Sequence, residues 1–310
     1  MSSTAINASQ KELFGHPAGL FILFFTEMWE RFSYYGMRAI LVLYLVSEST
    51  GFNPGLGWSN GDALALYGWY TMMVYVMSVP GGYIADKLLG QKKSVLFGGI
   101  LLVIGHSTLA IEQMWAFYTG LVFIVLGCGM LKPNISTMVG GLYKPGDIRR
   151  DKGFTIFYIG INLGAFISSL VVGYVGEVYG WHYGFGLAGI GMALGLLQYL
   201  IGLKYLKQVG DFLGATKDNK EVMNKPLTKI EIDRIVVLLI SFLLVIVFWG
   251  AFEQAGGLMN IYTMEKTDRF IGDWQVPASW FQSINAMFII FFGTAVAIFG
   301  PKGRLKGWFQ

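Results

Sequence analysis

Long apolar segments separated by short polar loops run through most of the chain. Eight such segments lie near residues 20–46, 63–85, 94–111, 115–142, 154–177, 183–206, 235–262 and 280–300. A helix that crosses a bilayer needs about 20 predominantly apolar residues. The pattern therefore predicts an all-α membrane protein with eight transmembrane helices.

Composition supports the same class of protein. Of the 310 residues, 54% are hydrophobic and only 14% are charged, and the mean hydropathy is +0.54. Soluble domains carry about 25% charged residues. The single cysteine, Cys128, excludes a disulfide within the chain. We expect a lipid bilayer as the surroundings and no nucleic-acid partner.

Charged residues in the loops alternate from one loop to the next. Lys and Arg follow the second, fourth, sixth and eighth segments, beginning with Lys87, Lys92 and Lys93. The loops after the first, third and fifth segments carry only acids, namely Glu48, Asp62, Glu112 and Glu177. Because cytoplasmic loops are enriched in Lys and Arg, the N-terminus and the even loops are predicted to be cytoplasmic. The mixed loop after the seventh segment is assigned to the outside.

A polar stretch at 208–234 separates six segments from two. We expect residues 1–207 to form an N-terminal six-helix bundle and 208–234 a cytoplasmic linker. Residues 235–310 would then be the start of a C-terminal bundle. Transporters built from two six-helix halves have this layout.

The first segment contains charges where lipid would tolerate none. Glu27, Glu30, Arg31, Tyr34 and Arg38 fall within one ~80° arc when about 100° is allowed for each helical residue. Ionised groups inside a membrane normally face the interior of a bundle or a water-filled path. The stripe is either functional or a buried ion-pair set that only holds helices together.

Further polar groups lie inside later segments. Lysines in membrane helices usually avoid lipid by extending their charged end to the membrane interface. Lys132 is too far from either end of its segment to do so easily. Glu253 is an intramembrane acid in the seventh segment, and such acids can exchange a proton when a nearby cation moves. Tyr75, Asn162 and Asn285 are candidate pocket residues, although such groups also simply pair with neighbouring helices.

Five segments resemble the proton-dependent oligopeptide transporter family of the major facilitator superfamily. Residues 27–35 match its E-x-x-E-R-F-x-Y-Y motif, and residues 157–164 match F-Y-x-x-I-N-x-G. Residues 82–93 resemble the superfamily's loop signature between helices two and three. Residues 248–254 and 280–285 resemble its helices seven and eight. The matches occur in family order from residue 24 to residue 285.

The resemblance implies import of di- and tripeptides, driven by protons as the coupling ion, across the bacterial inner membrane. It implies proton coupling by Glu27, Glu30, Arg31 and Lys132. Substrate-binding roles are implied for Arg38, Tyr34, Tyr35, Tyr75, Lys132, Asn162, Trp249, Glu253 and Asn285. Within this set, Arg38 and Lys132 suit a peptide carboxylate and Glu253 suits a peptide amino group.

Three features depart from the family pattern. The family has twelve core helices, whereas eight are predicted here, so we expect a partial chain whose second bundle is incomplete. Gly68 stands where animal members carry a histidine, which excludes that proton site. The linker at 208–234 is too short for the two extra helices that many bacterial members insert.

Other functions remain open at this stage. Plant relatives carry nitrate and other small anions, and a partial copy of the fold could be a membrane scaffold that transports nothing. An enzyme is not expected, because the three histidines lack metal-ligand spacing and no nucleophile–base pair stands out. We likewise expect no metal site and no organic cofactor.

Overall fold

The computed structural model describes residues 11–207, 209–212 and 228–304, with side chains described as far as residue 293. The main helices are α1 (Ala18–Val46), α2 (Asn60–Val76), α3 (Ser78–Ile84), α4 (Gln91–Leu109), α5 (Met114–Gly141), α6 (Arg149–Val178), α7 (Trp181–Gly202), α9 (Lys229–Phe252), α10 (Leu258–Lys266) and α11 (Ser283–Arg304). Shorter helical turns are η1 (Ala85–Leu89), η2 (Leu203–Tyr205), η3 (Glu253–Ala255) and η4 (Ala278–Gln282). Two small hairpins pair β1 (Glu12–Leu13) with β2 (His16–Pro17), and β3 (Phe270–Ile271) with β4 (Trp274–Gln275).

Helices occupy all eight predicted apolar segments. Among the described residues, four helical stretches are long and apolar enough to span a membrane by themselves, namely 114–141, 149–178, 181–205 and 229–266. α1 is equally long but contains four charged side chains. Several boundaries differ from the prediction by a few residues. The segment from α2 continues as helix through η1 as far as Leu89, and Gly90 (φ 78°) then turns the chain into α4.

The predicted linker is described only at its two ends. Gly210 accepts a hydrogen bond from the Lys92 amide (2.9 Å), and Asp211 pairs with the Lys92 side chain (2.9 Å). Residues 213–227 lie outside the described residues. α9 begins at Lys229, before the predicted start at 235, because Thr228 and Glu231 form a reciprocal capping box.

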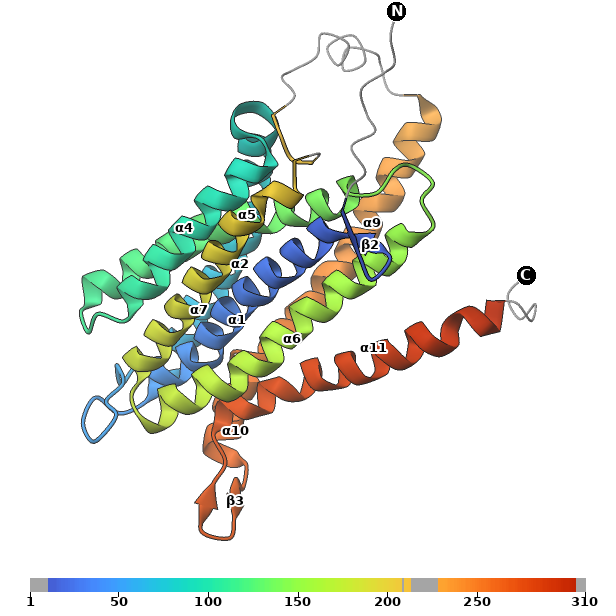
Figure 1. Cartoon of the computed structure of the whole chain (residues 1–310). Coiled ribbons are helices and arrows are strands. Elements are labelled where there is room, and N and C mark those ends of the chain that lie inside the picture. The colour runs from blue at the N-terminus through green and yellow to red at the C-terminus, as the bar shows by residue number, and fades with distance from the viewer. Residues whose placement is uncertain (1–10, 208, 213–227, 305–310) are drawn as a thin grey trace, which may run out of the picture.

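α1 is the central helix of the first part of the fold, which we call the α1–α7 bundle (Figure 1). It packs along α6 and α7, while α4 packs on α5. Glycines allow these close approaches. Gly164 of α6 faces the Met28 carbonyl of α1, and Gly98 of α4 faces the Gly127 carbonyl of α5. Small residues let membrane helices pack backbone to backbone in this way.

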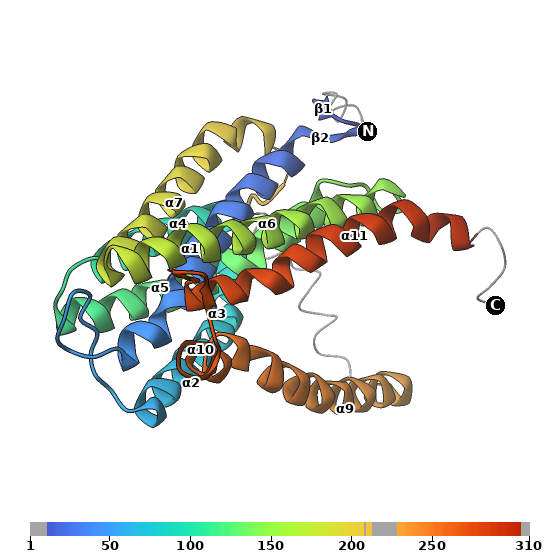
Figure 2. The same cartoon turned by 90° about the horizontal axis from the view of Figure 1, so that it is seen from below.

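The helices that follow residue 228 form the α9–α11 segment. α11 runs beside α6, whereas α9 lies apart from it on another side of the bundle (Figure 2). None of the side chains of α9 is buried. The α9–α11 segment therefore contacts the bundle mainly through α10, η3, η4 and the first part of α11.

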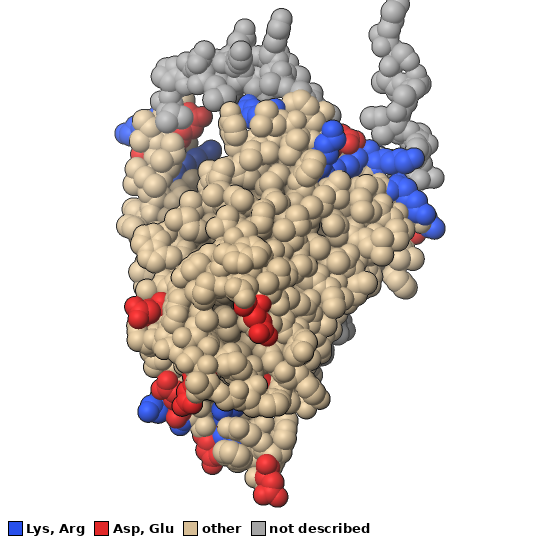
Figure 3. Space-filling view, turned by 90° about the vertical axis from the view of Figure 1, so that its left-hand side faces the viewer, with Lys and Arg blue, Asp and Glu red and all other residues tan. Residues whose placement is uncertain are grey.

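Charged side chains gather at the two ends of the molecule (Figure 3). Lys and Arg concentrate at the end where α6 and α9 begin, and Asp and Glu are more frequent at the end that carries the β3–β4 hairpin. On the face shown, most of the band between the ends is uncharged, with two small acidic patches within it. Such a band is what a protein that crosses a bilayer requires.

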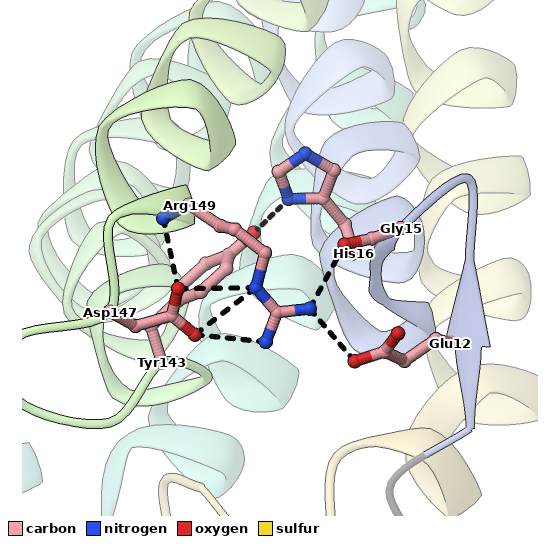
Figure 4. A network of polar contacts seen from close by, with 6 residues as sticks. All are labelled: Glu12, Gly15, His16, Tyr143, Asp147 and Arg149. Carbon is pink, nitrogen blue, oxygen red and sulfur yellow. Dashed lines mark hydrogen bonds and ion pairs between the residues drawn. The ribbon is translucent and has the colours of Figure 1, made fainter.

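The β1–β2 hairpin is held against the loop between α5 and α6 by a polar network (Figure 4). Arg149 donates hydrogen bonds to Asp147 (2.9 Å), Glu12 (2.8 Å) and the Gly15 carbonyl (3.1 Å). His16 is buried beneath this network, and its Nδ1 lies 2.8 Å from the Tyr143 hydroxyl. The chain before α1 is thus attached to the start of α6.

Protonation states in this network follow from its contacts. Hydrogen bonds from Arg149 hold the pKa of the Asp147 carboxyl below its usual value. Burial, reinforced by the positive charge of Arg149, lowers the pKa of His16 from its ordinary 6.5. Since the docked hairpin favours neutral His16, protonation works against docking.

We therefore expect acid to loosen the hairpin. The contribution of neutral His16 is present above pH 6.5 and is lost as the pH falls below that value through the lowered pKa. Hydrogen exchange at the Ala18 amide, which donates to the Lys11 carbonyl at 2.8 Å, should report the change after correction for intrinsic rates. His16→Asn keeps a polar group but cannot titrate, so its protection should vary less with pH. Equal pH dependence in both proteins would contradict the prediction.

Packing of α1 on α6 gives a second prediction. A Cβ at Gly164 would overlap the Met28 carbonyl oxygen, so Gly164→Ala must push the two helices apart. We expect a loss of about 1–3 kcal/mol of stability, as is typical of overpacking. Thermal melting of the purified protein measures it. Gly68→Ala is the matched control, because its new Cβ would meet nothing within 4 Å, and the prediction is wrong if both variants melt alike.

Candidate functional site

Three ionisable side chains of α1 form a buried cluster. Glu27, Glu30 and Arg31 are at most 3% exposed. Arg31 Nε lies 2.9 Å from Glu27 Oε1 and 2.5 Å from Glu30 Oε2. One guanidinium thus serves two carboxylates, so the three groups carry a net negative charge when all are ionised. The predicted orientation of this stripe, away from lipid, is confirmed.

α5 supplies two further groups beside the cluster. The Cys128 thiol donates a hydrogen bond to Glu30 Oε1 (3.7 Å). Lys132, one turn further along α5, places its Nζ 4.2 Å from the centre of the Tyr75 ring. No ion pair to Lys132 is found among the described residues. Its positive charge faces an aromatic ring of α2, an attraction that strengthens away from water.

An ion pair joins the α1–α7 bundle to the α9–α11 segment. Arg38 Nη1 lies 3.1 Å from Glu253 Oε2, at the end of α9. The Tyr75 hydroxyl donates to Glu253 Oε1 (3.1 Å), and the Tyr67 hydroxyl donates to the Glu253 carbonyl (3.2 Å). Tyr75 is therefore a common neighbour of Lys132 and of the Arg38–Glu253 ion pair.

A cavity of about 450 Å³ adjoins the ion pair, between α1, α6 and the α9–α11 segment. Ligand pockets commonly measure about 300–1,000 Å³. Of the predicted pocket residues, Tyr35, Arg38, Asn162 and Asn285 line it. Apolar residues from α6, α9 and α11 form much of the remaining wall. The cavity therefore combines a cation and amides with a tolerant apolar surface.

The other predicted residues lie elsewhere. Tyr34 is buried in the core beneath the Arg31 guanidinium, which lies 5.6 Å from its ring centre. Trp249 is exposed on α9, against the rings of Phe248 and Phe252. Tyr75, Lys132 and Glu253 are not among the residues that line this cavity in the described structure. Of these three, Glu253 contacts the cavity-lining Arg38 directly, Tyr75 contacts Glu253, and Lys132 contacts Tyr75.

Sequence reasoning missed several polar residues of the cavity wall, namely Ser169, Asn260, Thr263 and Gln282. Gln282 precedes Asn285 by three residues, which places both on one helical face, and that spacing could have identified it. Asn260 is buried and donates a hydrogen bond to the Ala39 carbonyl (2.8 Å). It is one of two side-chain amides in the predicted seventh segment, the other being Gln254, so the sequence could have indicated it.

Contacts between the two parts of the fold concentrate at the end that carries the β3–β4 hairpin. Besides the Arg38–Glu253 pair, Asn60 donates to Glu265 (3.1 Å) and the Trp280 indole donates to the Leu170 carbonyl (2.9 Å). Towards the opposite end, α9 and α11 diverge (Figure 1). This conformation is closed at the hairpin end.

Comparison with known proteins identifies the family. A model described as "POT family" matches residues 92–217 and 213–300. The chain is 35% identical over 351 residues to the peptide transporter YePEPT of Yersinia enterocolitica, covering 94% of this chain and 68% of the relative. It is 45% identical over 242 residues to a di-/tripeptide transporter of Lactococcus lactis subsp. cremoris, covering 77% of this chain.

The fold agrees with the same relationship. The structure superposes with a TM-score of 0.78 on a crystal structure of the peptide transporter POT in complex with sulfate, at 37% identity over 94% of this chain and 71% of the other. The chain spans about half the length (48%) of the Lactococcus lactis transporter that it matches. With matches of this identity and coverage in both sequence and structure, the chain is a multi-pass membrane protein that belongs to the POT family of the major facilitator superfamily.

Proposed function

We propose that the protein is a proton-coupled symporter that imports di- and tripeptides by alternating access. The observation that carries the proposal is the Arg38–Glu253 ion pair, which joins the two parts of the fold at the wall of the cavity. A zwitterionic peptide brings one carboxylate and one ammonium group. The peptide carboxylate can replace Glu253 as the partner of Arg38, and the ammonium group can replace Arg38 as the partner of Glu253.

In this mechanism the peptide exchanges with the ion pair. Its carboxylate takes the place of Glu253 beside Arg38, with Lys132 nearby, and its amino group takes the place of Arg38 beside Glu253. Both protein charges already have little contact with water, with 5% and 14% of their side chains exposed. Because much of the desolvation is already incurred, exchange of partners is favoured over binding at isolated charges.

Proton coupling is assigned to Glu27, Glu30, Arg31 and Lys132. A buried acid takes up a proton when its balancing cation moves away, because burial disfavours the charged form. Lys132 faces Tyr75, and Tyr75 donates to Glu253. A shift of Lys132 towards the acids of α1 would therefore also change the contacts of Glu253, which connects protonation to the Arg38–Glu253 ion pair.

The placement in the membrane is part of the proposal. We infer that the protein lies in a bacterial inner membrane, with its N-terminus and the Lys- and Arg-rich end in the cytoplasm, as the positive-inside rule expects. The hairpin end, closed in this conformation, then faces outwards. The partners are the peptide, the proton and the bilayer, with no catalytic activity and no cofactor besides the coupling proton.

We expect Lys132→Ala to abolish uphill uptake of a labelled dipeptide into proteoliposomes with a pH gradient. Exchange of peptide across the same membranes should be partly retained, because removal of the cation disturbs the acids of α1 more than the cavity wall. Lys93→Ala, at an exposed position of α4, is the control and should keep both activities. Equal loss of uptake and exchange would assign Lys132 to binding or folding. Failure of the unaltered chain to transport would favour a scaffold.

Substitution Glu253→Gln tests the orientation of the bound peptide. It should weaken competition by peptides with a free amino group, while N-acetylated peptides, already poor ligands, should be about unchanged. The neutral amide keeps the shape of the side chain but no longer attracts an ammonium group. Glu48→Gln, in an exposed loop, is the control. If both classes of peptide lose affinity equally, the amino group does not bind at Glu253, and strong competition by nitrate would indicate an anion transporter.

A further inference from the structure

Glu177, in the last turn of α6, accepts three hydrogen bonds from η4 in the α9–α11 segment. The amides of Ala278 and Ser279 donate to it at 2.9 and 2.8 Å, and the Ser279 hydroxyl donates at 2.5 Å. The carboxylate is 14% exposed and lies 4.0 Å from Arg269. It therefore satisfies the free amides at the beginning of a helical turn that belongs to the other part of the fold.

The backbone of α6 is shaped to receive this turn. A Cβ at Gly173 would overlap the Ser279 hydroxyl, so the absence of a side chain at position 173 is what lets η4 lie against α6. On the same surface, the Trp280 ring contacts Tyr174 (centroids 6.2 Å apart). The surfaces of α6 and η4 are therefore complementary in shape at this contact.

This contact is separate from the Arg38–Glu253 pair. Glu177 is near the end of α6, and its partners belong to η4, whereas Glu253 lies at the end of α9. Hydrogen bonds to a charged group are roughly twice as strong as those between neutral groups. Three of them meet on one carboxylate that is only 14% exposed, so this is a strong polar contact between the two parts of the described structure.

We propose that Glu177 is a positioning residue for transport, whose carboxylate holds the hairpin end of the pathway closed. Opening that end requires η4 to leave α6, and the two amides and the hydroxyl must then find water while Glu177 is solvated. The charge of Glu177 thereby sets how much of the population is closed. The role in transport rests on the function proposed above, but the closure itself does not.

Distance measurement between spin labels tests the closure without any transport. Labels at Tyr183→Cys on α7 and Lys266→Cys on α10 are placed at exposed positions on either side of the contact, and the native Cys128 is buried. We expect Glu177→Gln to shift the distance distribution to longer values. Glu112→Gln, an exposed acid at the same end, is the matched control and should leave the distribution unchanged.

Two further variants make the result independent of one substitution. Ser279→Ala removes one of the three donors and should give a smaller shift than Glu177→Gln. Gly173→Ala keeps every hydrogen-bonding group but fills the space that Ser279 occupies, so it should also lengthen the distance. A merely stabilising role would lower the melting temperature without changing the distances in the folded protein.

The outcomes separate the two proposals. Unchanged distances in both Glu177→Gln and Gly173→Ala would overturn the role of Glu177, whatever the protein transports. Longer distances in a chain that transports no peptide would support the closure and count against the proposed symport. In a transporting chain, longer distances should accompany a loss of uphill uptake.

Discussion

The cost of holding charge inside an apolar layer is the constraint on which the rest of this structure depends. α1 carries Glu27, Glu30 and Arg31 in the interior, and a single guanidinium balances two carboxylates. Such a set is tolerated only with further donors and cations close by. Cys128 and Lys132 of α5 meet that need, and this fixes which face of α1 points into the bundle.

The same constraint acts between the two parts of the fold. Arg38 and Glu253 would each be costly alone, and each is the other's partner while the hairpin end is closed. Separation of the two parts therefore requires a substitute for both charges, and a zwitterion is the simplest one. In contrast, Glu177 is balanced mainly by backbone amides, which can return to water without a substitute. In the proposed mechanism, opening of the Arg38–Glu253 contact thus depends on substrate, whereas opening of the Glu177 contact does not.

Hydropathy alone predicted the helices, because crossing a bilayer demands a length of apolar chain that few other structures need. The buried stripe of α1 was predictable for the same energetic reason. The partner of each charged residue could not be predicted. Helical periodicity indicates on which side of its own helix a residue lies, but not which residue of another helix lies opposite to it. Tyr34 and Tyr35 are adjacent in one motif, yet Tyr34 lies in the core and Tyr35 lines the cavity.

Glu177 is the residue whose role is least apparent from the polarity pattern of the sequence. From the sequence, Glu177 is interpreted as one more acid of a loop without Lys or Arg. Its position near the end of an apolar segment is consistent with exposure to water. Its partners are amides of Ala278 and Ser279, and every residue has a backbone, so composition cannot mark them. The signal that remained was Gly173, one turn earlier on the same helix, where the lack of a side chain makes room for the approaching turn. Acids one turn from a glycine on a membrane helix are therefore worth testing as inter-helix contacts before they are assigned to a loop.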